Sequence, residues 1–464
     1  MAAQGRFLTG STMGHVARMT MTGAMGITFV FLVDAANLFW ISQLGDPQLI
    51  AAIGFAFAIQ YFSVSAGIGL MIAATALVSR GIGAGAREEA RRHVTSAAII
   101  AGLFQCCMAA LIILFRHDLV SFAGATGETA RLAARYLAMS VPSLGIMAVA
   151  MIANGALRAE GDGRRSMFVT LTSGSVAMVI DPFLILGLGM GLDGAALGLN
   201  LSRCVMLVMA LRFAVGTHDL LAPPAWEDLR ASFRPYLAIA LPAILTQMST
   251  PVGNYLMTTV MAQFGDAAVA GWAVVGRLTV VAFGGIFSLS GAIGGIFGQN
   301  FGARQYDRLR TTYRDALLFG LIYTLLTWAV LVAVSDLVIA GFGLTPAGAE
   351  VVHAFAHVGV GGFIFAAALF VSNSAFNALG WPARSTLTNW VRDGALTLPL
   401  ALLMAGWFAA PGVIYAQALV NLLVGAAAAF WGWRFVVALG RKTLPPLDLD
   451  PPRPYAHADR FRRR

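Results

Sequence analysis

The chain has 464 residues, of which 58% are hydrophobic and only 11% are charged. Soluble domains carry about 25% charged residues, so this composition excludes an ordinary soluble enzyme, which needs more charge to cover its surface. The net charge is +9, from 31 basic and 22 acidic residues. The three cysteines, Cys106, Cys107 and Cys204, lie inside apolar runs and have neither a disulfide framework nor a metal-binding spacing.

Apolar runs long enough to cross a bilayer, which takes about 20 residues each, dominate the sequence. Short turns that contain Gly or Pro separate several of them, for example at 44–47 and 410–412. The first run is too long for a cleavable signal peptide and lacks a small-residue cleavage site. We predict an all-α integral membrane protein with twelve transmembrane helices. The predicted spans are 16–42, 48–78, 94–115, 130–153, 166–190, 194–214, 236–262, 267–297, 313–337, 349–373, 385–408 and 412–438.

The basic residues are distributed unevenly between the two sides of this topology. With the N-terminus inside, 25 of the 31 lie on the inner side, in or within a few residues of the N-terminal region, the even-numbered loops or the tail. Three lie on the outer side, and three lie in the middle of spans. Because cytoplasmic loops carry the excess of Lys and Arg, we predict cytoplasmic termini in the plasma (inner) membrane. Topology thus accounts for the charge, and nucleic acid is not an expected partner. The basic tail is expected to contact anionic membrane lipid, with a solvated tail as the alternative.

The sequence also repeats itself at a nearly constant offset. A shift of 219 residues carries Gly83 onto Gly302 and Asn154 onto Asn373. Two halves with six spans each have the same orientation in the membrane, an arrangement typical of alternating-access transporters. The predicted domains are an N-terminal six-helix lobe at 1–214, a cytoplasmic linker at 215–235, a pseudo-symmetric C-terminal six-helix lobe at 236–440 and a disordered basic cytoplasmic tail at 441–464.

Several short strings, in this order and spacing, resemble those of multidrug and toxic compound extrusion (MATE) transporters. The resemblance covers the chain up to about residue 440. The strings are VD at 33–34, LG at 44–45, GAG at 83–85, LRAEGD at 157–162, DP at 181–182, GAA at 194–196, GQNFG at 298–302 and GAR at 302–304.

The resemblance implies two six-helix lobes around a V-shaped substrate-binding cleft. It also implies efflux of xenobiotics by antiport against a proton or sodium gradient. The expected partners are therefore a small lipophilic or cationic organic substrate and a proton or sodium ion. Neither a cofactor nor a bound metal is predicted.

Ionisable side chains inside membrane spans are costly and point to function. Asp34 and Asp181 each lie nine or ten residues before the outer end of a span, about 13–16 Å deep at 1.5 Å per residue. Tyr136 and Asn200 enter their spans about six residues from the same side, so these four residues can converge in the first lobe. Asn37 is one turn from Asp34 on the same helix face. Burial disfavours a charged carboxylate, as a proton-coupled carrier requires.

The pair Asp34 and Asp181 matches the acidic pair of the MATE subgroup whose ion site lies in the N-terminal lobe. The sequence departs from that subgroup at Ala177 and Leu199, where the subgroup carries Asn and Thr. Two neutral oxygen ligands for sodium, a hard cation that requires oxygen ligands, are therefore missing unless Asn200 supplies one. We favour a proton over sodium as the coupling ion.

Arg203 lies one turn beyond Asn200. We expect it to pair with Asp181, because their spans are adjacent, which leaves Asp34 to exchange protons. An alternative role for Asp181 is to cap the backbone that Pro182 frees. The predicted cation-coupling residues are Asp34, Asn37, Tyr136, Asn154, Asp181, Asn200 and Arg203.

In the second lobe, Arg277 and Asp393 lie at matching mid-membrane depth, and we expect them to form a structural ion pair. His353 and His357 are spaced as on one helix face near Glu350. Their place at the outer start of a span favours interfacial solvation over a metal site.

Flexible and polar side chains on two spans are candidates for a substrate cavity. Methionine adapts its shape to varied lipophilic ligands, although ordinary helix packing is the alternative for each one. The candidates are Met178, Gln247, Met248, Asn254 and Met257.

Two other functional classes compete with an exporter. A flippase for lipid-linked saccharides or polyprenols, from the same superfamily, needs several cationic residues facing its cavity, and the spans offer only Arg203, Arg277 and Arg392. A membrane enzyme needs a nucleophile or clustered His and Asp, and the sequence has no HExxH motif, paired acidic motif or nucleophile elbow. We therefore predict a transporter and not an enzyme.

Overall fold

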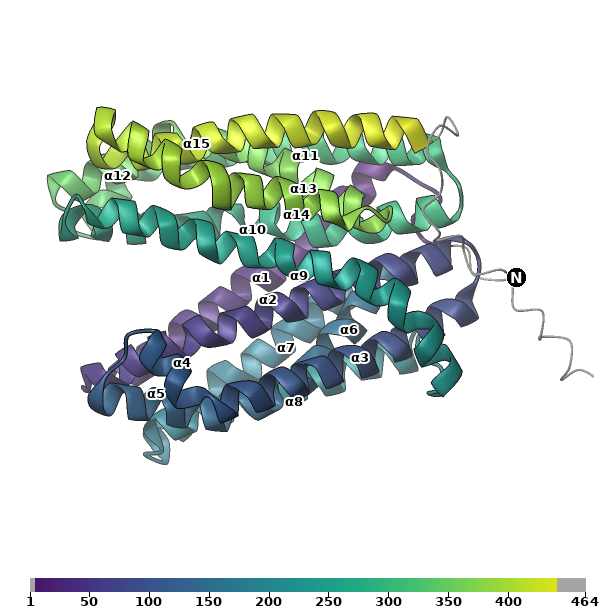
Figure 1. Ribbon diagram of the computed structural model, residues 1–464, viewed down its shortest axis with the longest axis horizontal. Coiled ribbons are helices and arrows are strands. Elements are labelled where there is room, and N and C mark those ends of the chain that lie inside the picture. The colour runs from purple at the N-terminus through teal and green to yellow at the C-terminus, as the bar shows by residue number, and fades with distance from the viewer. Residues whose placement is uncertain (1–4, 440–464) are drawn as a thin grey trace, which may run out of the picture.

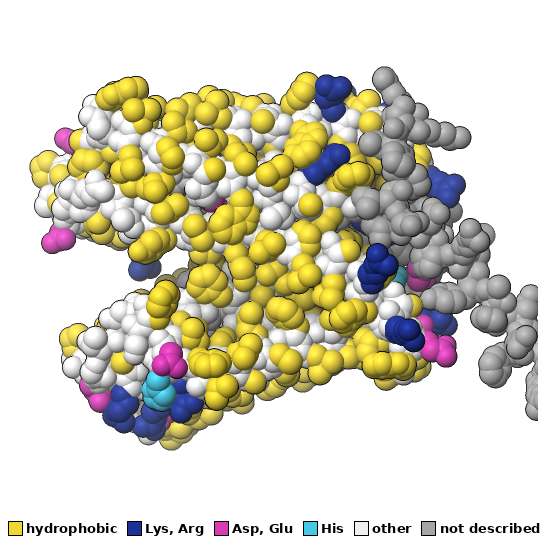
Figure 2. All heavy atoms as spheres, in the orientation of Figure 1, with side chains coloured by type: hydrophobic (Ala, Val, Ile, Leu, Met, Phe, Trp, Pro, Cys, Tyr) yellow, Lys and Arg dark blue, Asp and Glu magenta, His cyan; other side chains and the backbone are white. Residues whose placement is uncertain are grey.

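The computed structural model describes residues 5–439, and these are almost entirely helical. The helices form two lobes that meet at one end and diverge toward the other (Figure 1). We call the end where the lobes meet, near the start of the described chain, the closed end, and the opposite end the open end. Figure 2 shows hydrophobic side chains along the sides of both lobes and charged side chains gathered toward their two ends. This is the surface of a protein that spans a membrane. The predicted tail at 441–464 lies outside the described residues.

The first lobe (the N-lobe) contains the first eight α-helices, a 3₁₀ turn and a π-helical turn. They are α1 (Thr12–Ser42), α2 (Pro47–Gly83), α3 (Arg87–Leu114), α4 (Arg116–Phe122), α5 (Gly127–Ser140), η1 (Val141–Ser143), α6 (Leu144–Glu160), α7 (Gly163–Pro182), η2 (Phe183–Gly187) and α8 (Gly191–Gly216).

The second lobe (the C-lobe) repeats this order. It contains α9 (Trp226–Ala262), α10 (Asp266–Gly302), α11 (Tyr306–Gly341), α12 (Pro346–His357), η3 (Gly359–Gly361), α13 (Gly362–Ala378), α14 (Pro382–Trp390), η4 (Val391–Leu396) and α15 (Thr397–Leu439).

Ten helical segments of the described chain are long and apolar enough to cross a membrane. The last of these, Pro382–Leu439, has 58 residues and holds two predicted spans, which meet at Ala409, where φ is 53°. The remaining predicted span corresponds to α9, whose 37 residues include three prolines. The structure therefore confirms the predicted fold class, an all-α membrane protein with two lobes.

The internal repeat extends to backbone detail. Helices α2 and α10 both have 37 residues and start 219 positions apart. The turns after α6 and α13 each contain a left-handed glycine, Gly161 with φ 93° and Gly380 with φ 94°. Each lobe also has a π-helical turn in its fifth predicted span, although η2 and η4 start 208 and not 219 positions apart. The two halves thus share one backbone plan.

At the closed end, α2 and α10 approach each other backbone to backbone. A Cβ atom at Gly83 would overlap the backbone of Gln299, and one at Gly302 would overlap the carbonyl of Arg80. Gly298 lies equally close to the Ser79 side chain. Because both helices have glycine at the crossing, the lobes make a contact there that no larger residue permits.

The segment before α1 fills the junction of the lobes at the closed end. Phe7 is 1% exposed. Its N–H donates to Gln299 Oε1 at 2.9 Å, and its carbonyl accepts from Arg308 Nη2 at 2.9 Å, both in the C-lobe. The side chain of Arg6 donates to the Gly161 carbonyl of the N-lobe at 3.3 Å. The first described residues therefore bridge the two lobes.

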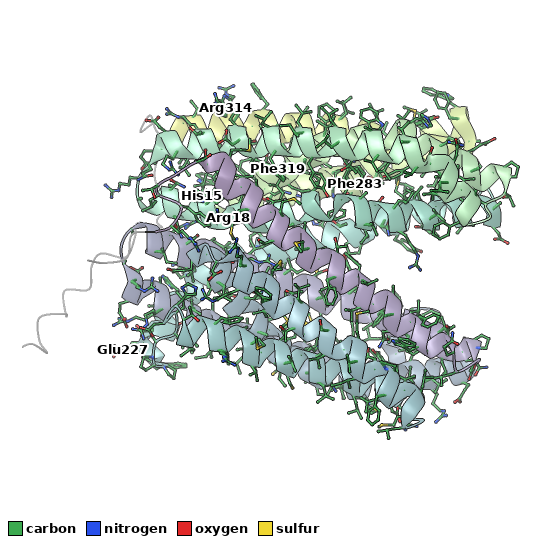
Figure 3. The ribbon with its side chains drawn as sticks, turned by 180° about the vertical axis from the view of Figure 1, so that it is seen from behind. His15, Arg18, Glu227, Phe283, Arg314 and Phe319 are labelled. Carbon is green, nitrogen blue, oxygen red and sulfur yellow. The ribbon has the colours of Figure 1, made fainter. Side chains whose placement is uncertain are left out.

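Helix α1 crosses from one lobe to the other. Figure 3 shows it starting near His15 and Arg18 beside the C-lobe and running diagonally to the N-lobe at the open end. Near its start, the Thr20 carbonyl accepts a hydrogen bond from Ser288 of α10 at 3.0 Å. Further along, Phe29 packs on Gly174 of α7. One helix thus contacts both sides of the cleft.

An extended segment at 217–225 joins the lobes and is held on the N-lobe. Arg91 Nη2 donates to the Leu221 carbonyl at 2.8 Å. His218 Nε2 lies 2.9 Å from Asp162 Oδ2, at the start of α7. Burial would raise the pKa of Asp162, but hydrogen bonds from His218 and from the backbone and side chain of Arg165 hold the pKa below its usual value.

We predict that Gly83→Ala destabilises the protein by about 1–3 kcal/mol, because the added methyl group overlaps the backbone of α10. Gly54→Ala is the matched control, since it lies in the same helix with open space around its Cβ position. It should be neutral or stabilising by up to about 1 kcal/mol. Thermal denaturation in detergent measures both, and a Gly83→Ala variant as stable as Gly54→Ala would contradict the close contact.

We also predict that Asp162→Ala destabilises the protein at neutral pH by about 0.5–2 kcal/mol, the usual cost of losing a helix N-cap. A carboxylate whose pKa is lowered by folding stabilises above its unfolded pKa of about 3.9 and loses this effect as the pH falls through its folded pKa. The difference in melting temperature between wild type and variant should therefore be full at pH 7 and shrink below about pH 4. An unchanged difference at low pH would mean that the carboxylate charge plays no part.

Candidate functional site

The predicted polar residues of the N-lobe gather in its open half. Counting along the helices from their open ends, Asp34, Tyr136, Asn200 and Arg203 lie about 12–18 Å deep. The Tyr136 hydroxyl is within electrostatic range of Arg203, Asp181 and Asp34. The sequence therefore predicted the convergence of these side chains, while their pairing differs from the prediction in two places.

Asp181 is buried and bonded to Asn37. It is 3% exposed, and its Oδ2 accepts a hydrogen bond from Asn37 Nδ2 at 2.8 Å. Its Oδ1 faces Gly198 on α8, where a Cβ would overlap it. Asp181 Oδ1 and Asn37 Oδ1 are both buried without a hydrogen-bond partner among the described residues. Burying a carboxylate oxygen without a donor is costly, so the geometry favours a proton or a cation at this position.

Asp181 does not take the alternative role of capping the backbone near Pro182. The backbone adapts to Pro182 by forming a π-helical turn, in which the Leu188 N–H donates to the Phe183 carbonyl at 2.8 Å. The hydrogen bond of the Asp181 side chain goes to Asn37 on another helix. The carboxylate is thus directed toward α1.

Asp34 lies one turn before Asn37 on α1, and its side chain is exposed. It has no hydrogen bond or ion pair within residues 5–439. Contrary to the expectation that Asn37 supports Asp34, the Asn37 amide donates to Asp181. In the open half of the N-lobe, Asp181 is therefore buried, whereas solvent can reach Asp34.

Arg203 is not the partner of Asp181, and this prediction is wrong. Arg203 is 5% exposed. Its Nη1 donates to the Ser140 carbonyl at 2.8 Å and to Ser143 Oγ at 2.7 Å, and its Nη2 donates to Gln60 Oε1 at 3.2 Å. Depth alone placed Arg203 near Asp181, but its position around the axis of α8 directs it toward α2 and η1. Neutral oxygens, not carboxylates, solvate this buried cation.

Asn200 belongs to the Arg203 network, and Asn154 lies apart from the carboxylates. Ser143 Oγ donates to Asn200 Oδ1 at 2.6 Å, and Asn200 Nδ2 donates to the Met139 carbonyl at 2.8 Å. Asn154 is six residues from the closed end of α6, about 18 Å nearer that end than Asp181. The buried Asn154 Oδ1 has no partner among the described residues.

In the C-lobe, the predicted pair of Arg277 with Asp393 is wrong. Asp393 is paired with its neighbour Arg392, whose Nε lies 2.7 Å from Oδ1 and whose Nη2 lies 2.9 Å from Oδ2. Ser249 of α9 also donates to Asp393 Oδ2 at 2.9 Å. Arg277 is exposed and pairs with no residue in the described part of the chain. Arg392 and Asp393 both lie in the π-helical turn η4.

The predicted cavity residues differ in accessibility. Met178, Gln247 and Met248 are half-buried and Asn254 is exposed. Met257 is 2% exposed and lies in the apolar core of the C-lobe. The prediction that Met257 lines a cavity is therefore wrong for this conformation, because α9 turns it toward its own lobe.

Sequence reasoning missed the residues that hold the buried charges. Gln60, Ser140 and Ser143 solvate Arg203, and Ser249 contacts Asp393. The one available signal was polarity: Gln60 interrupts an otherwise apolar predicted span at 48–78. Serines are common in membrane helices and carry too little signal.

The MatE family profile matches the chain twice, at residues 24–183 and 242–403. The two matches start 218 and end 220 positions apart, in agreement with the internal repeat. The chain belongs to the MatE family of multidrug and toxic compound extrusion transporters.

Relatives and solved structures agree with this family. The FAD transporter of Shewanella oneidensis is 26% identical over 88% of this chain and 92% of its own length. The multidrug export protein MepA of Staphylococcus aureus is 24% identical over 87% of this chain and 90% of its own.

An outward-facing structure of a multidrug resistance MATE family transporter superposes with a TM-score of 0.87 at 21% identity, covering 94% of this chain and 99% of the other. A transporter from Pyrococcus furiosus, described as having a binding pocket of reverse polarity, gives 0.86 at 22% identity, covering 94% and 98%. These two likenesses concern the fold.

We predict that Asp393→Ala destabilises this transporter by about 3–5 kcal/mol, because it leaves Arg392 buried without its counter-charge. Replacing both residues with Ala should recover much of the loss. Arg277→Ala is the matched control and should leave the melting temperature unchanged, since Arg277 is exposed and unpaired among the described residues. A double variant that melts no higher than Asp393→Ala would argue against the pair.

Proposed function

We propose that this protein is a secondary active exporter of small organic molecules, in which Asp34 and Asp181 couple efflux to proton entry by alternating access. One observation carries the proposal: a buried carboxylate oxygen and a buried amide oxygen without hydrogen donors lie beside an accessible, unpaired carboxyl group on the helix that links the lobes. The names of the relatives support export of organic compounds, because MepA is a multidrug export protein.

Coupling follows from the cost of charge at Asp34 and Asp181. Asp34 lies one turn of α1 from Asn37, the residue that binds Asp181. When both carboxyl groups are ionised, the two negative charges repel each other, and Asp181 Oδ1 lacks a donor among the described residues. A proton on either group removes this cost. Because α1 also contacts α10 of the other lobe, the charge at Asp34 can favour one opening of the cleft over the other. A ligand shifts such an equilibrium only through a differential affinity for the two states.

A proton needs fewer oxygen ligands at this site than a sodium ion does. Sodium needs several oxygen ligands, and Ala177 and Leu199 offer none from their side chains. Asn200 is engaged with Ser143 and the Met139 carbonyl. The orphan oxygens of Asp181 and Asn37 are two acceptors, sufficient for a shared proton.

We further propose that the closed end faces the cytoplasm of the inner membrane. The turns at this end, which include residues 84–86 and 303–305, lie in the basic loops that the positive-inside rule assigns to the cytoplasm. The cleft then opens to the outside, ready to release substrate and take up a proton. The proposed lobes follow the predicted division, but the linker shortens from 215–235 to 217–225, because α8 runs to Gly216 and α9 starts at Trp226.

A second candidate is export of a flavin dinucleotide, favoured by the likeness to the FAD transporter over 88% of this chain. The lipid-linked flippase is less well supported. It requires several cations in the cleft, whereas Arg203 and Arg392 are buried in their lobes. Family members are transporters, which supports a transporter and not an enzyme.

The decisive variant is Asp34→Asn, which mimics the protonated carboxyl group. We predict that it folds with wild-type stability and binds substrate but does not export it against a gradient. Asp336→Asn is the matched control, since the Asp336 side chain is 91% exposed, and it should export normally. Everted vesicles with an imposed pH gradient and a fluorescent organic substrate provide the measurement.

Asp181→Asn should also lose coupled efflux while keeping wild-type stability, because Arg203 does not depend on Asp181. Undiminished pH-driven efflux by Asp34→Asn would refute proton coupling through this residue. Efflux that requires sodium at fixed pH, without a pH gradient, would replace the proton with sodium in the proposal.

A further inference from the structure

We propose that Arg277 is an anion-binding residue of the cleft, and that the exported molecules include organic anions or zwitterions whose carboxylate, sulfonate or phosphate group binds there. This inference rests on the proposed export function and specifies its substrate class. The sequence predicted a lipophilic or cationic substrate. Here, the part of the substrate that contacts the C-lobe wall is instead an anionic group.

Three arginines lie in the middle of predicted spans, and they differ in exposure and in hydrogen-bond partners. Arg203 is 5% exposed, and neutral oxygens satisfy it. Arg392 is 7% exposed and bonded to Asp393 through two nitrogens. Arg277 is exposed and has neither a hydrogen bond nor an ion pair within residues 5–439. It is thus the one member of this set whose guanidinium remains available to a ligand.

Between the closed end and Gly284, one face of α10 meets the N-lobe. Every seventh residue returns to about the same helix face. In this series, Gly298 meets Ser79, Gly291 meets Arg158 and Gly284 meets Thr28, all of them N-lobe residues. The backbone of α10 is kinked at Phe283, where φ is −109° and ψ is 15°, so this count ends at Gly284. Beyond the kink, both Arg277 and its neighbour Gly276 are exposed on the surface of the C-lobe.

The lobes have diverged by the level of Arg277. Val281, one turn nearer the closed end, is 67% exposed, and a Cβ at the neighbouring Gly276 would meet no atom within 4 Å. Figure 2 shows the cleft between the lobes at this end and a basic side chain on its C-lobe wall. Arg277 lies eleven residues into α10, about 17 Å from the open end.

A guanidinium that faces lipid at the depth of Arg277 costs several kcal/mol. A water-filled cleft removes that cost. Arg277 has no hydrogen-bond acceptor within residues 5–439. Its guanidinium, a planar group of N–H donors, can therefore bind a carboxylate or phosphate through two hydrogen bonds.

The opposite wall adds polarity to the cleft. Asp34, exposed on α1, lies eleven residues, or three turns, beyond Gly23, which packs against Ser288 of α10. Asp34 therefore also lies on the helix face that meets the other lobe. A positive group on the C-lobe wall and an acidic group on the N-lobe wall would orient a substrate with its anion toward Arg277.

The test measures binding without any gradient, so its outcome is independent of proton coupling. The purified full-length transporter in lipid nanodiscs is titrated with three probes that share a pyrene fluorophore: pyrenebutyrate, pyrenebutanol and pyrenebutyl-trimethylammonium. Fluorescence anisotropy reports the Kd of each. The variants are Arg277→Gln, Arg277→Lys and the control Arg314→Gln. Arg314 carries the same charge on the same lobe, is exposed, and lies on the side turned away from the cleft (Figure 3).

We expect wild type to bind the carboxylate probe more tightly than the other two. Arg277→Gln should weaken carboxylate binding by about ten- to a hundredfold, the effect of losing a charge-assisted hydrogen-bonded pair. Arg277→Lys should retain part of it, because it keeps the charge but not the fork. Arg314→Gln should match wild type.

Three results would overturn the inference: no carboxylate binding by wild type, tightest binding of the trimethylammonium probe, or equal loss in Arg277→Gln and Arg314→Gln. None of these affects the Asp34→Asn efflux result. Proton-coupled export of cations with unchanged binding by Arg277→Gln would refute the anion site and leave the proposed function intact.

Discussion

The close crossing of α2 and α10 at the closed end fixes the arrangement of everything else in this transporter. Glycine at 83 and 302 lets two helix backbones touch, and each glycine belongs to the same position of its own repeat. Because the lobes meet backbone to backbone here and diverge beyond, the cleft opens toward one end. Phe7, buried at this junction and bonded to Gln299, reinforces the closure from the N-terminal side.

Helix α1 connects this junction to the polar site. Its first turns bond to α10, and its later turns pack on α7 and carry Asp34 and Asn37. A change of charge at Asp34 therefore occurs on a helix that contacts both lobes. Asp181 is held by Asn37, and its second carboxylate oxygen has no donor among the described residues.

The two lobes share a backbone plan but not a chemistry. Each has a π-helical turn in its fifth predicted span with an aspartate in or near the turn, but Asp181 and Asp393 are 212 positions apart and are not equivalent in the repeat of 219. In the C-lobe, Arg392 neutralises Asp393 with two hydrogen bonds, a closed structural unit. In the N-lobe, Asp181 has an amide partner and no cation. The two aspartates thus occupy different positions of the repeat, and within the described residues Asp393 has a cationic partner whereas Asp181 has an amide partner.

The sequence by itself determined the membrane spans, the repeat and the depth of each polar residue, because hydropathy and the 1.5 Å rise per residue are local properties. It could not determine which polar groups pair at a given depth. Arg203 and Asp181 lie at similar depth, yet Arg203 turns to Gln60, and Asp393 pairs with Arg392 and not with Arg277. Those choices depend on the rotation of each helix about its own axis. Packing against the other helices sets that rotation, so only the tertiary structure decided it.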